Sequence, residues 1–102
     1  MDQESIQQIY AAIHGVPTGR LCSYGKVAEL AGLPGHARYV GRLLSKLPKN
    51  SRLPWFRIVN SKGKISLPPN SESYERQLGH LIAESSADES GQLFWRQCRW
   101  PD

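Results

Sequence analysis

The sequence predicts a mainly α-helical fold of the winged helix-turn-helix type, with a short β-hairpin. Three observations predict it. Apolar residues recur at helical spacing in successive segments, a tight glycine-containing turn separates two of these segments, and a β-prone run with a polar turn follows them. A chain of 102 residues buries one modest core, so we expect residues 1–102 to form a single domain.

The first two helices are defined by apolar faces and by residues that begin or end a helix. The first face has the i, i+3, i+4, i+7 spacing and consists of Ile6, Ile9, Tyr10 and Ile13. Gly15 and Pro17 end this helix, and Ser23 is the expected N-cap of the second. The apolar side of the second helix is formed by Tyr24, Val27, Ala28 and Ala31.

The third helix, expected over about residues 37–47, has the clearest two-sided pattern. Its inward face is apolar and contains Val40, Leu43, Leu44 and Leu47. Its opposite face is basic or small and contains Arg38, Gly41, Arg42 and Ser45. A mid-helix glycine costs about 1 kcal/mol relative to alanine, and Gly41 on the basic face would let a phosphate backbone or base edge come close. Two short helices with outward arginines on the second predict a helix-turn-helix.

A hairpin, a last helix and an aromatic tail complete the chain. Residues 53–59 are apolar and β-prone, residues 60–63 form a turn, and residues 64–66 return. Lys62 and Lys64 at this turn would suit phosphates, or would serve solubility alone. The last helix begins near Asn70 or Ser71, with an apolar face of Tyr74, Leu78, Leu81 and Ile82. The tail from Leu93 to Trp100 is expected to fold back onto the body, with partner binding as the alternative.

The charge distribution predicts a polyanionic partner. Residues 18–64 contain ten basic residues and a single acid, Glu29, although the whole chain has a net charge of only +4. Such a one-sided basic segment in a small domain is typical of nucleic-acid binding. The chain has no signal-like start and no apolar run of membrane-spanning length, so we expect a cytoplasmic protein without a membrane partner. Cys22 and Cys98 lack metal-binding spacing, and we expect no disulfide, metal or other cofactor.

Four motifs occur in a characteristic order: Val16-Pro17-x-Gly19, Tyr24-Gly25, Ala37-Arg38-x-Val40-Gly41 and Pro54-Trp55-Phe56-Arg57-Ile58-Val59. Together they resemble the DNA-binding and active-site domain of the O6-alkylguanine-DNA alkyltransferases, over about residues 16–66. In those enzymes the last motif contains Pro-Cys-His-Arg, and its cysteine takes the alkyl group from guanine. Here Trp55 stands at the cysteine position and Phe56 at the histidine position. The reaction needs a thiolate nucleophile and a proton acceptor. An indole has no accessible nucleophilic lone pair and a phenyl ring accepts no proton, so the resemblance implies no catalytic residue.

A tryptophan at the cysteine position is typical of the alkyltransferase-like proteins, which this chain resembles. Most members keep the histidine, so Phe56 is a departure. The resemblance implies that the chain binds O6-alkylguanine in duplex DNA by nucleotide flipping, without alkyl transfer, and flags it for nucleotide excision repair proteins. We expect it to act as a monomer.

The resemblance also implies roles for individual residues. The lesion pocket would be formed by Trp55, Tyr24, Phe56 and Arg57. Arg38 would be the finger that replaces the extruded nucleotide, and Tyr24 would help to rotate the 3′ phosphate. The expected DNA contacts are Ser23, Tyr24, Arg38, Gly41, Arg42, Ser45, Lys62 and Lys64. Glu84 lies where the enzymes place an acid that orients the histidine, a relay that Phe56 would leave without its middle member.

Alternatives remain open for the residues and for the function. Arg38 could contact only phosphate, Tyr24 could be a core aromatic, Trp55 could be simply buried, and Arg57 could brace the fold. A winged-helix transcription regulator would instead read sequence through Arg38 and Arg42 in the major groove. A working enzyme would need Cys22 or Cys98 as its nucleophile, although neither lies in the motif.

Overall fold

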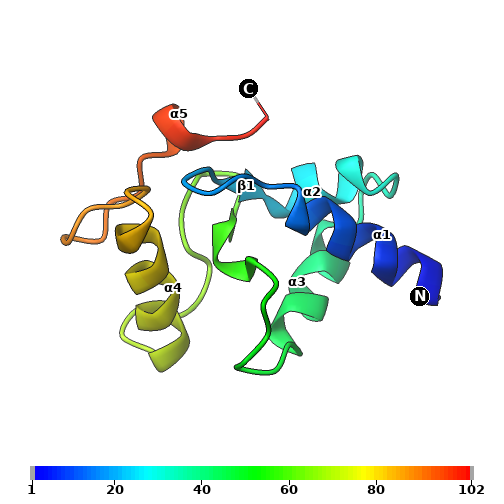
Figure 1. Ribbon diagram of the computed structural model, residues 1–102, viewed down its shortest axis with the longest axis horizontal. Helices are drawn as coiled ribbons and strands as arrows, with labels where there is room; N and C mark the ends of the chain where they lie inside the picture. The colour runs from blue at the N-terminus through cyan, green and yellow to red at the C-terminus, as the bar shows by residue number, and fades with distance from the viewer. Residues whose placement is uncertain (1, 102) are drawn as a thin grey trace.

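The computed structural model describes residues 2–101 and is mainly helical, which confirms the predicted fold class. Its elements in order are α1 (Gln3–His14), β1 (Cys22–Ser23), α2 (Tyr24–Leu30), α3 (Ala37–Ser45), the 3₁₀-helix η1 (Trp55–Arg57), β2 (Ile58–Val59), α4 (Glu72–Ala83) and α5 (Trp95–Cys98). Helices α1, α2 and α3 lie on one side of the two short strands, and α4 lies on the other (Figure 1).

The strand pair separates two apolar cores. β1 and β2 are parallel, with Cys22 opposite Ile58 and Ser23 opposite Val59. Because successive side chains of a strand point to opposite faces, Cys22 and Ile58 pack into the core formed with α1, α2 and α3. Leu21 and Val59 point the other way, into the core formed with α4 and α5. The short sheet therefore joins the helix-turn-helix half to the C-terminal half.

Helices α1, α2 and α4 begin where a serine or aspartate side chain satisfies a free backbone N–H group. The Ser23 side chain accepts a hydrogen bond from the Lys26 N–H at 3.1 Å, which confirms the predicted N-cap of α2. The Ser71 side chain accepts one from the Tyr74 N–H at 3.1 Å, so α4 begins at the predicted place. Asp2 caps α1 in the same way.

The predicted pairing of a hairpin over residues 53–66 is wrong. Residues 55–57 form η1 rather than strand, and β2 pairs in parallel with β1 instead of with the returning segment 64–66. The turn itself is present, because the Asn60 N–H donates to the Lys64 carbonyl at 2.9 Å. Ile58 and Val59 are both buried, one in each core, and a strand that is apolar on both faces favours a place between two packed layers over an exposed hairpin.

The C-terminal tail folds back onto the body, as predicted. The Leu21 N–H donates to the Cys98 carbonyl at 2.8 Å, and the Trp100 N–H donates to the Leu21 carbonyl at 2.7 Å. The Trp100 ring packs against the first core, and Trp95 packs against the second. The tail thus lies beside Leu21, just before β1, and contacts both cores.

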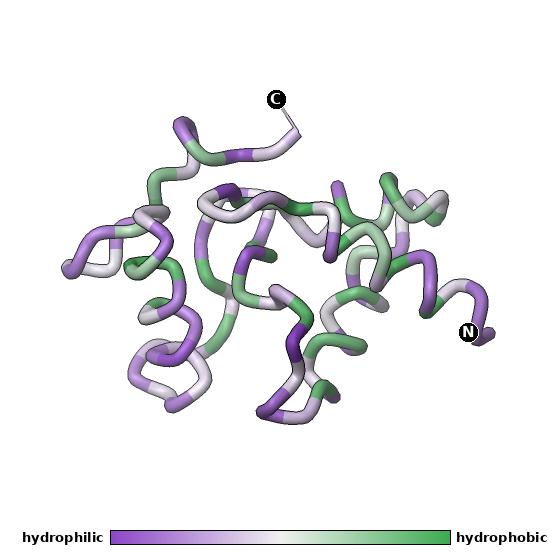
Figure 2. The backbone as a smooth tube through the Cα atoms, viewed as in Figure 1, coloured by the Kyte–Doolittle hydropathy of each residue, from purple (hydrophilic) through white to green (hydrophobic). Residues whose placement is uncertain are grey.

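Hydrophobic stretches of the backbone concentrate where α1, α2 and α3 meet, whereas the turn between α3 and η1 is hydrophilic (Figure 2). Within residues 2–101 no helix has the length and apolar character needed to cross a membrane. The same residues contain no group of three or more His, Cys, Asp or Glu side chains that could hold a metal ion. Both cysteines are free thiols.

Candidate nucleic-acid interface

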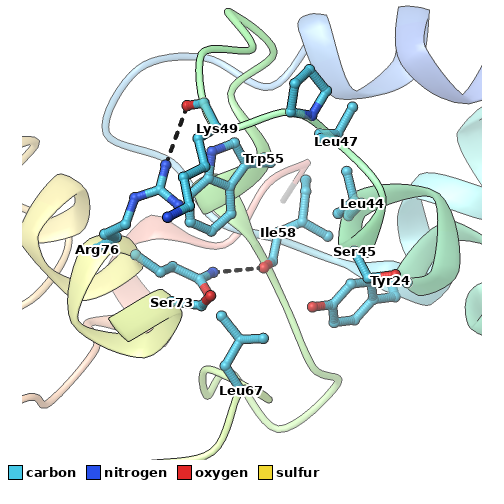
Figure 3. Close-up of a pocket in the computed structure, with 13 residues that line it drawn as sticks. Tyr24, Leu44, Ser45, Leu47, Lys49, Trp55, Ile58, Leu67, Ser73 and Arg76 are labelled. Atoms are coloured by element: carbon cyan, nitrogen blue, oxygen red, sulfur yellow. Dashed lines mark hydrogen bonds between the residues drawn. The ribbon is translucent and has the colours of Figure 1, made fainter. Parts of the chain in front are cut away.

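A cavity of about 260 Å³ opens between the helix-turn-helix half and α4 (Figure 3). Its lining residues come from α2, α3, the α3–η1 turn, η1, β2, the segment before α4, and α4 itself. They are Tyr24, Gly41, Leu44, Ser45, Leu47, Pro48, Lys49, Trp55, Ile58, Leu67, Ser73, Arg76 and Gln77. Two of the four residues predicted to form one pocket, Trp55 and Tyr24, therefore line the same cavity.

Trp55 forms one wall of the cavity. The Arg76 guanidinium lies over the indole, 5.6 Å from the ring centroid, and its Nη2 donates to the Lys49 carbonyl at 3.3 Å. Figure 3 shows Trp55 and Arg76 on one side and Tyr24 with Leu44 on the other. The cavity is thus bounded by an aromatic side chain on each of two sides, with the Arg76 cation beside one of them.

Phe56 does not line this cavity, contrary to the prediction for the pocket. Its ring stacks on His80 of α4, with centroids 4.2 Å apart and planes 12° from parallel. It also packs against the second core. Both rings meet the Trp55 indole edge-on, at centroid distances of 5.9 Å from Phe56 and 6.1 Å from His80. Phe56 and His80 therefore support the indole from the side away from the cavity.

Arg57 also lies outside the cavity lining and braces the fold. It forms two hydrogen bonds with the Glu84 carboxylate, Nε–Oε1 at 2.9 Å and Nη2–Oε2 at 2.6 Å. Its remaining donors reach the Val16 carbonyl at 2.9 Å and the Thr18 hydroxyl at 3.0 Å. Arg57 thereby ties η1 to α4 and to the loop before β1.

Glu84 is the partner of Arg57 rather than of the residue at position 56. Burial alone would raise the pKa of its carboxyl. The hydrogen bonds from Arg57 and from the Gly19 N–H, together with the Arg57 and His80 charges, hold that pKa below its ordinary value. The side chains of Arg57 and Glu84 are only 13% and 14% exposed, so this is a largely buried ion pair.

The buried amide of Gln77 holds the segment that carries Trp55 against α4. Its Nε2 donates to the Phe56 and Ile58 carbonyls, both at 3.0 Å, and the residue is 2% exposed. Both acceptors belong to the segment that carries the indole. The wall of the cavity is therefore attached to α4 by hydrogen bonds from the Gln77 side chain to main-chain carbonyls, as well as by side-chain packing.

The opposite wall is formed by Tyr24 and Gly41. The Tyr24 hydroxyl is hydrogen-bonded to the Ser66 hydroxyl at 2.9 Å. A Cβ on Gly41 would lie 3.9 Å from the Tyr24 ring, so the face of α3 on which Gly41 was predicted borders the cavity. Ser45 lines the same wall, with its hydroxyl donating to the Arg42 carbonyl at 2.7 Å.

The predicted DNA-contacting side chains divide between two places. Arg38 and Arg42 are exposed on α3, beside the cavity, and Ser23 lies at the start of α2. Lys62 and Lys64 are exposed too, but they line a second cavity with Tyr74 and Trp95.

Sequence reasoning missed Arg76 and Gln77 as residues of the site. Their only local signal is that they lie on the polar side of α4, where the apolar periodicity leaves them unassigned. Lys49, in the turn after α3, also lines the cavity, and its Nζ pairs with the Glu72 carboxylate at 3.1 Å.

Comparison with known proteins identifies the family. Residues 4–86 match the model of the 6-O-methylguanine DNA methyltransferase, DNA binding domain. A DNA base-flipping protein of Vibrio parahaemolyticus is 46% identical over 98% of both chains. Alkyltransferase-like protein 1 of Schizosaccharomyces pombe is 35% identical, over 79% of this chain and 75% of its own length.

Solved structures agree with these relatives. The structure of S. pombe Atl1 with damaged DNA containing O6-carboxymethylguanine covers all of this chain and 99% of its own, with a TM-score of 0.86 and 29% identity. The Mycobacterium tuberculosis OGT in complex with DNA covers 84% of this chain and 52% of its own, with a TM-score of 0.69 and 28% identity. The chain therefore belongs to the 6-O-methylguanine DNA methyltransferase DNA-binding domain family, among its alkyltransferase-like members.

Proposed function

We propose that this chain binds O6-alkylguanine in duplex DNA by flipping the modified nucleotide into the cavity beside Trp55, without alkyl transfer, and thereby flags it for nucleotide excision repair. The observation that supports this most directly is the Trp55 wall of a cavity that opens beside the exposed arginines of α3. The similarity to a DNA base-flipping protein and to Atl1 bound to damaged DNA supports the same proposal.

Base flipping explains why an aromatic wall and an arginine finger belong together. Extruding a nucleotide costs a few kcal/mol, and least for a damaged pair. Stacking of the extruded base on an aromatic ring returns about 1–3 kcal/mol. In the proposed complex Trp55 provides this stacking, while Arg38 fills the vacated space in the duplex. Because the two energies are comparable, the preference for the lesion is expected to be real but limited.

The loss of the reaction follows from the residues at the motif. Trp55 offers no nucleophile and Phe56 accepts no proton, so the two groups that a thiolate transfer needs are absent there. Cys22 is fully buried in the first core, and burial raises the pKa of its thiol to about 11. Cys98 packs against the second core, and neither cysteine lines the cavity.

The proposal is tested by a paired binding measurement at one salt concentration. Two duplexes of identical sequence, one with a single O6-methylguanine, are titrated with the protein in a gel-shift assay. We expect about tenfold tighter binding to the modified duplex, equivalent to ~1.4 kcal/mol. Equal affinities would contradict lesion recognition, and dependence on one operator sequence would favour a transcription regulator.

The absence of transfer is tested separately with DNA that carries a radiolabelled alkyl group. We expect no label on the protein, and we expect the protein to inhibit a true alkyltransferase by competing for the lesion. Label on Cys22 or Cys98 would show that the chain is an enzyme.

The role of Trp55 is tested by Trp55→Ala in the paired gel-shift assay. We expect the preference for the modified duplex to fall several-fold, towards equal affinity, because the stacking wall is lost. Affinity for the unmodified duplex should change little. Phe94→Ala is the matched control, since Phe94 is an aromatic residue that lines neither cavity, and this variant should keep most of the lesion preference.

A further inference from the structure

A second cavity, of about 470 Å³, lies on the C-terminal half of the molecule and has no part in the function proposed above. Its walls are aromatic or aliphatic, and two exposed lysines lie among them. The lining includes Lys62, Lys64, Ile65, Tyr74, Leu93 and Trp95. Among residues 2–101, no acidic residue lines it. The cavity therefore combines apolar surface with an uncompensated positive charge.

The cavity is built by close packing around the Asn60–Lys64 turn. Gly63 has a φ of +75°, and a Cβ there would lie 2.3 Å from the Trp95 ring, so only glycine lets the turn pack on the indole. The Asn60 carboxamide oxygen accepts hydrogen bonds from the Lys62 N–H at 2.9 Å and the Lys64 N–H at 3.1 Å. The backbones of both lysines are thus held in place beside the apolar walls.

The two cavities share the segment from residue 65 to residue 69. Ile65 and Pro69 line the second cavity, whereas Leu67 lines the cavity beside Trp55. Between them, Ser66 is hydrogen-bonded to Tyr24 at 2.9 Å. An occupant of the second cavity would therefore contact the segment that borders the cavity beside Trp55, and would leave the cavity beside Trp55 open.

We propose that the second cavity is a docking site for an acidic segment of a partner protein that carries an apolar side chain. The carboxylates pair with Lys62 and Lys64, and the apolar side chain fills the space between Tyr74, Leu93 and Trp95. A DNA backbone matches this site less well, because phosphates need only the lysines and would leave the apolar walls uncovered. The part that docking plays in flagging a lesion rests on the function proposed above, whereas docking itself is measured without DNA.

The test uses a phage-displayed library of random dodecapeptides, selected on the whole protein. We expect enrichment of peptides with net negative charge and at least one aromatic or large aliphatic residue. A selected peptide should bind Lys64→Glu at least fivefold more weakly than wild type. Lys46→Glu, which removes an exposed lysine at the end of α3, should change its affinity less than twofold.

The binding place is then mapped by ¹⁵N NMR titration of the selected peptide. We expect shifts at Lys62, Lys64, Leu93 and the Trp95 indole, and we expect the peptide and the O6-methylguanine duplex to bind together. Basic or uncharged selected peptides, equal binding to Lys64→Glu, or shifts confined to the Trp55 cavity would overturn the proposal. So would unmodified duplex shifting the Lys62, Lys64 and Trp95 signals, since the cavity would then belong to the DNA surface.

These outcomes separate the two proposals. Loss of peptide docking with intact lesion preference overturns only the docking site. Loss of lesion preference with intact docking overturns only the function proposed for the Trp55 cavity.

Discussion

Two adjacent aromatic residues, Trp55 and Phe56, have different roles because η1 turns between them. A 3₁₀-helix has three residues per turn, so neighbouring side chains point in directions about 120° apart. The two rings are 85° from coplanar, with Trp55 facing the cavity and Phe56 stacked on His80. Phe56 therefore contributes to the support of the indole through its packing, a role that needs no hydrogen-bonding side chain.

At the same scale, Arg38 is predicted to hold the extruded state. We expect Arg38→Ala to reduce nucleotide flipping about tenfold, or ~1.4 kcal/mol, because nothing then fills the vacated space in the stack. Flipping is measured by the fluorescence of 2-aminopurine, a base analogue placed in the duplex next to the lesion. Arg96→Ala, an exposed change on α5, is the control. Undiminished flipping in Arg38→Ala would mean that this arginine contacts only phosphate.

A stability prediction concerns Gly63. Gly63→Ala should lower the free energy of unfolding by about 2–4 kcal/mol, since the new Cβ would clash with Trp95 and alanine is strained at the positive φ of this position. Gly79→Ala is the matched control. Nothing lies within 4 Å of a Cβ on Gly79 in α4, and we expect a gain of up to ~1 kcal/mol. Urea unfolding of both variants measures the difference, and equal stabilities would mean that the turn does not pack on Trp95.

At the scale of elements, the Arg57–Glu84 pair fixes η1 against α4 and the loop before β1. Both side chains are largely buried, so removing one charge leaves the other without a partner. The exposed pair between Lys49 and Glu72 has side chains 78% and 73% exposed, and solvent screens it. Only the first pair is therefore expected to matter for stability and for the position of Trp55.

We predict that Glu84→Gln lowers the free energy of unfolding by roughly 3 kcal/mol at neutral pH, whereas Glu72→Gln changes it by less than about 0.5 kcal/mol. The pKa of Glu84 is lowered in the folded state, so its contribution is present above the ordinary glutamate pKa of about 4.3 and is lost as the pH falls through the folded pKa. Unfolding measured from pH 7 to pH 3 should accordingly show a smaller acid loss in Glu84→Gln than in wild type. Parallel curves would place the acid sensitivity elsewhere.

At the scale of the whole molecule, the positive charge of residues 18–64 includes the exposed cations Arg38, Arg42, Lys46, Lys49 and Arg52 in and just after α3. Contacts between such cations and phosphates depend on salt but not on the base. The Trp55 cavity is a separate feature that distinguishes one base from another. General affinity and lesion preference are therefore expected to respond differently to salt.

We predict that affinity for both duplexes falls with salt while their ratio stays constant. If roughly four phosphates are contacted, log K should fall against log salt with a slope of about −3.6. Fluorescence anisotropy at several salt concentrations, with modified and unmodified duplex side by side, measures both quantities. A ratio that falls together with the affinity would mean that lesion preference comes from backbone charge rather than from the cavity.

The sequence by itself determined α1 to α4, the N-caps of α2 and α4, and the basic face of α3, because apolar spacing and Ser23 or Ser71 as N-caps act within a few residues. It also identified Trp55 and Tyr24, because the motifs that contain them are local. Tertiary structure alone decided the parallel partner of β2, the membership of Lys49 and Arg76 in the cavity, and the stacking of Phe56 on His80. These features depend on which distant segments meet around the two cores, and no local pattern encodes such contacts.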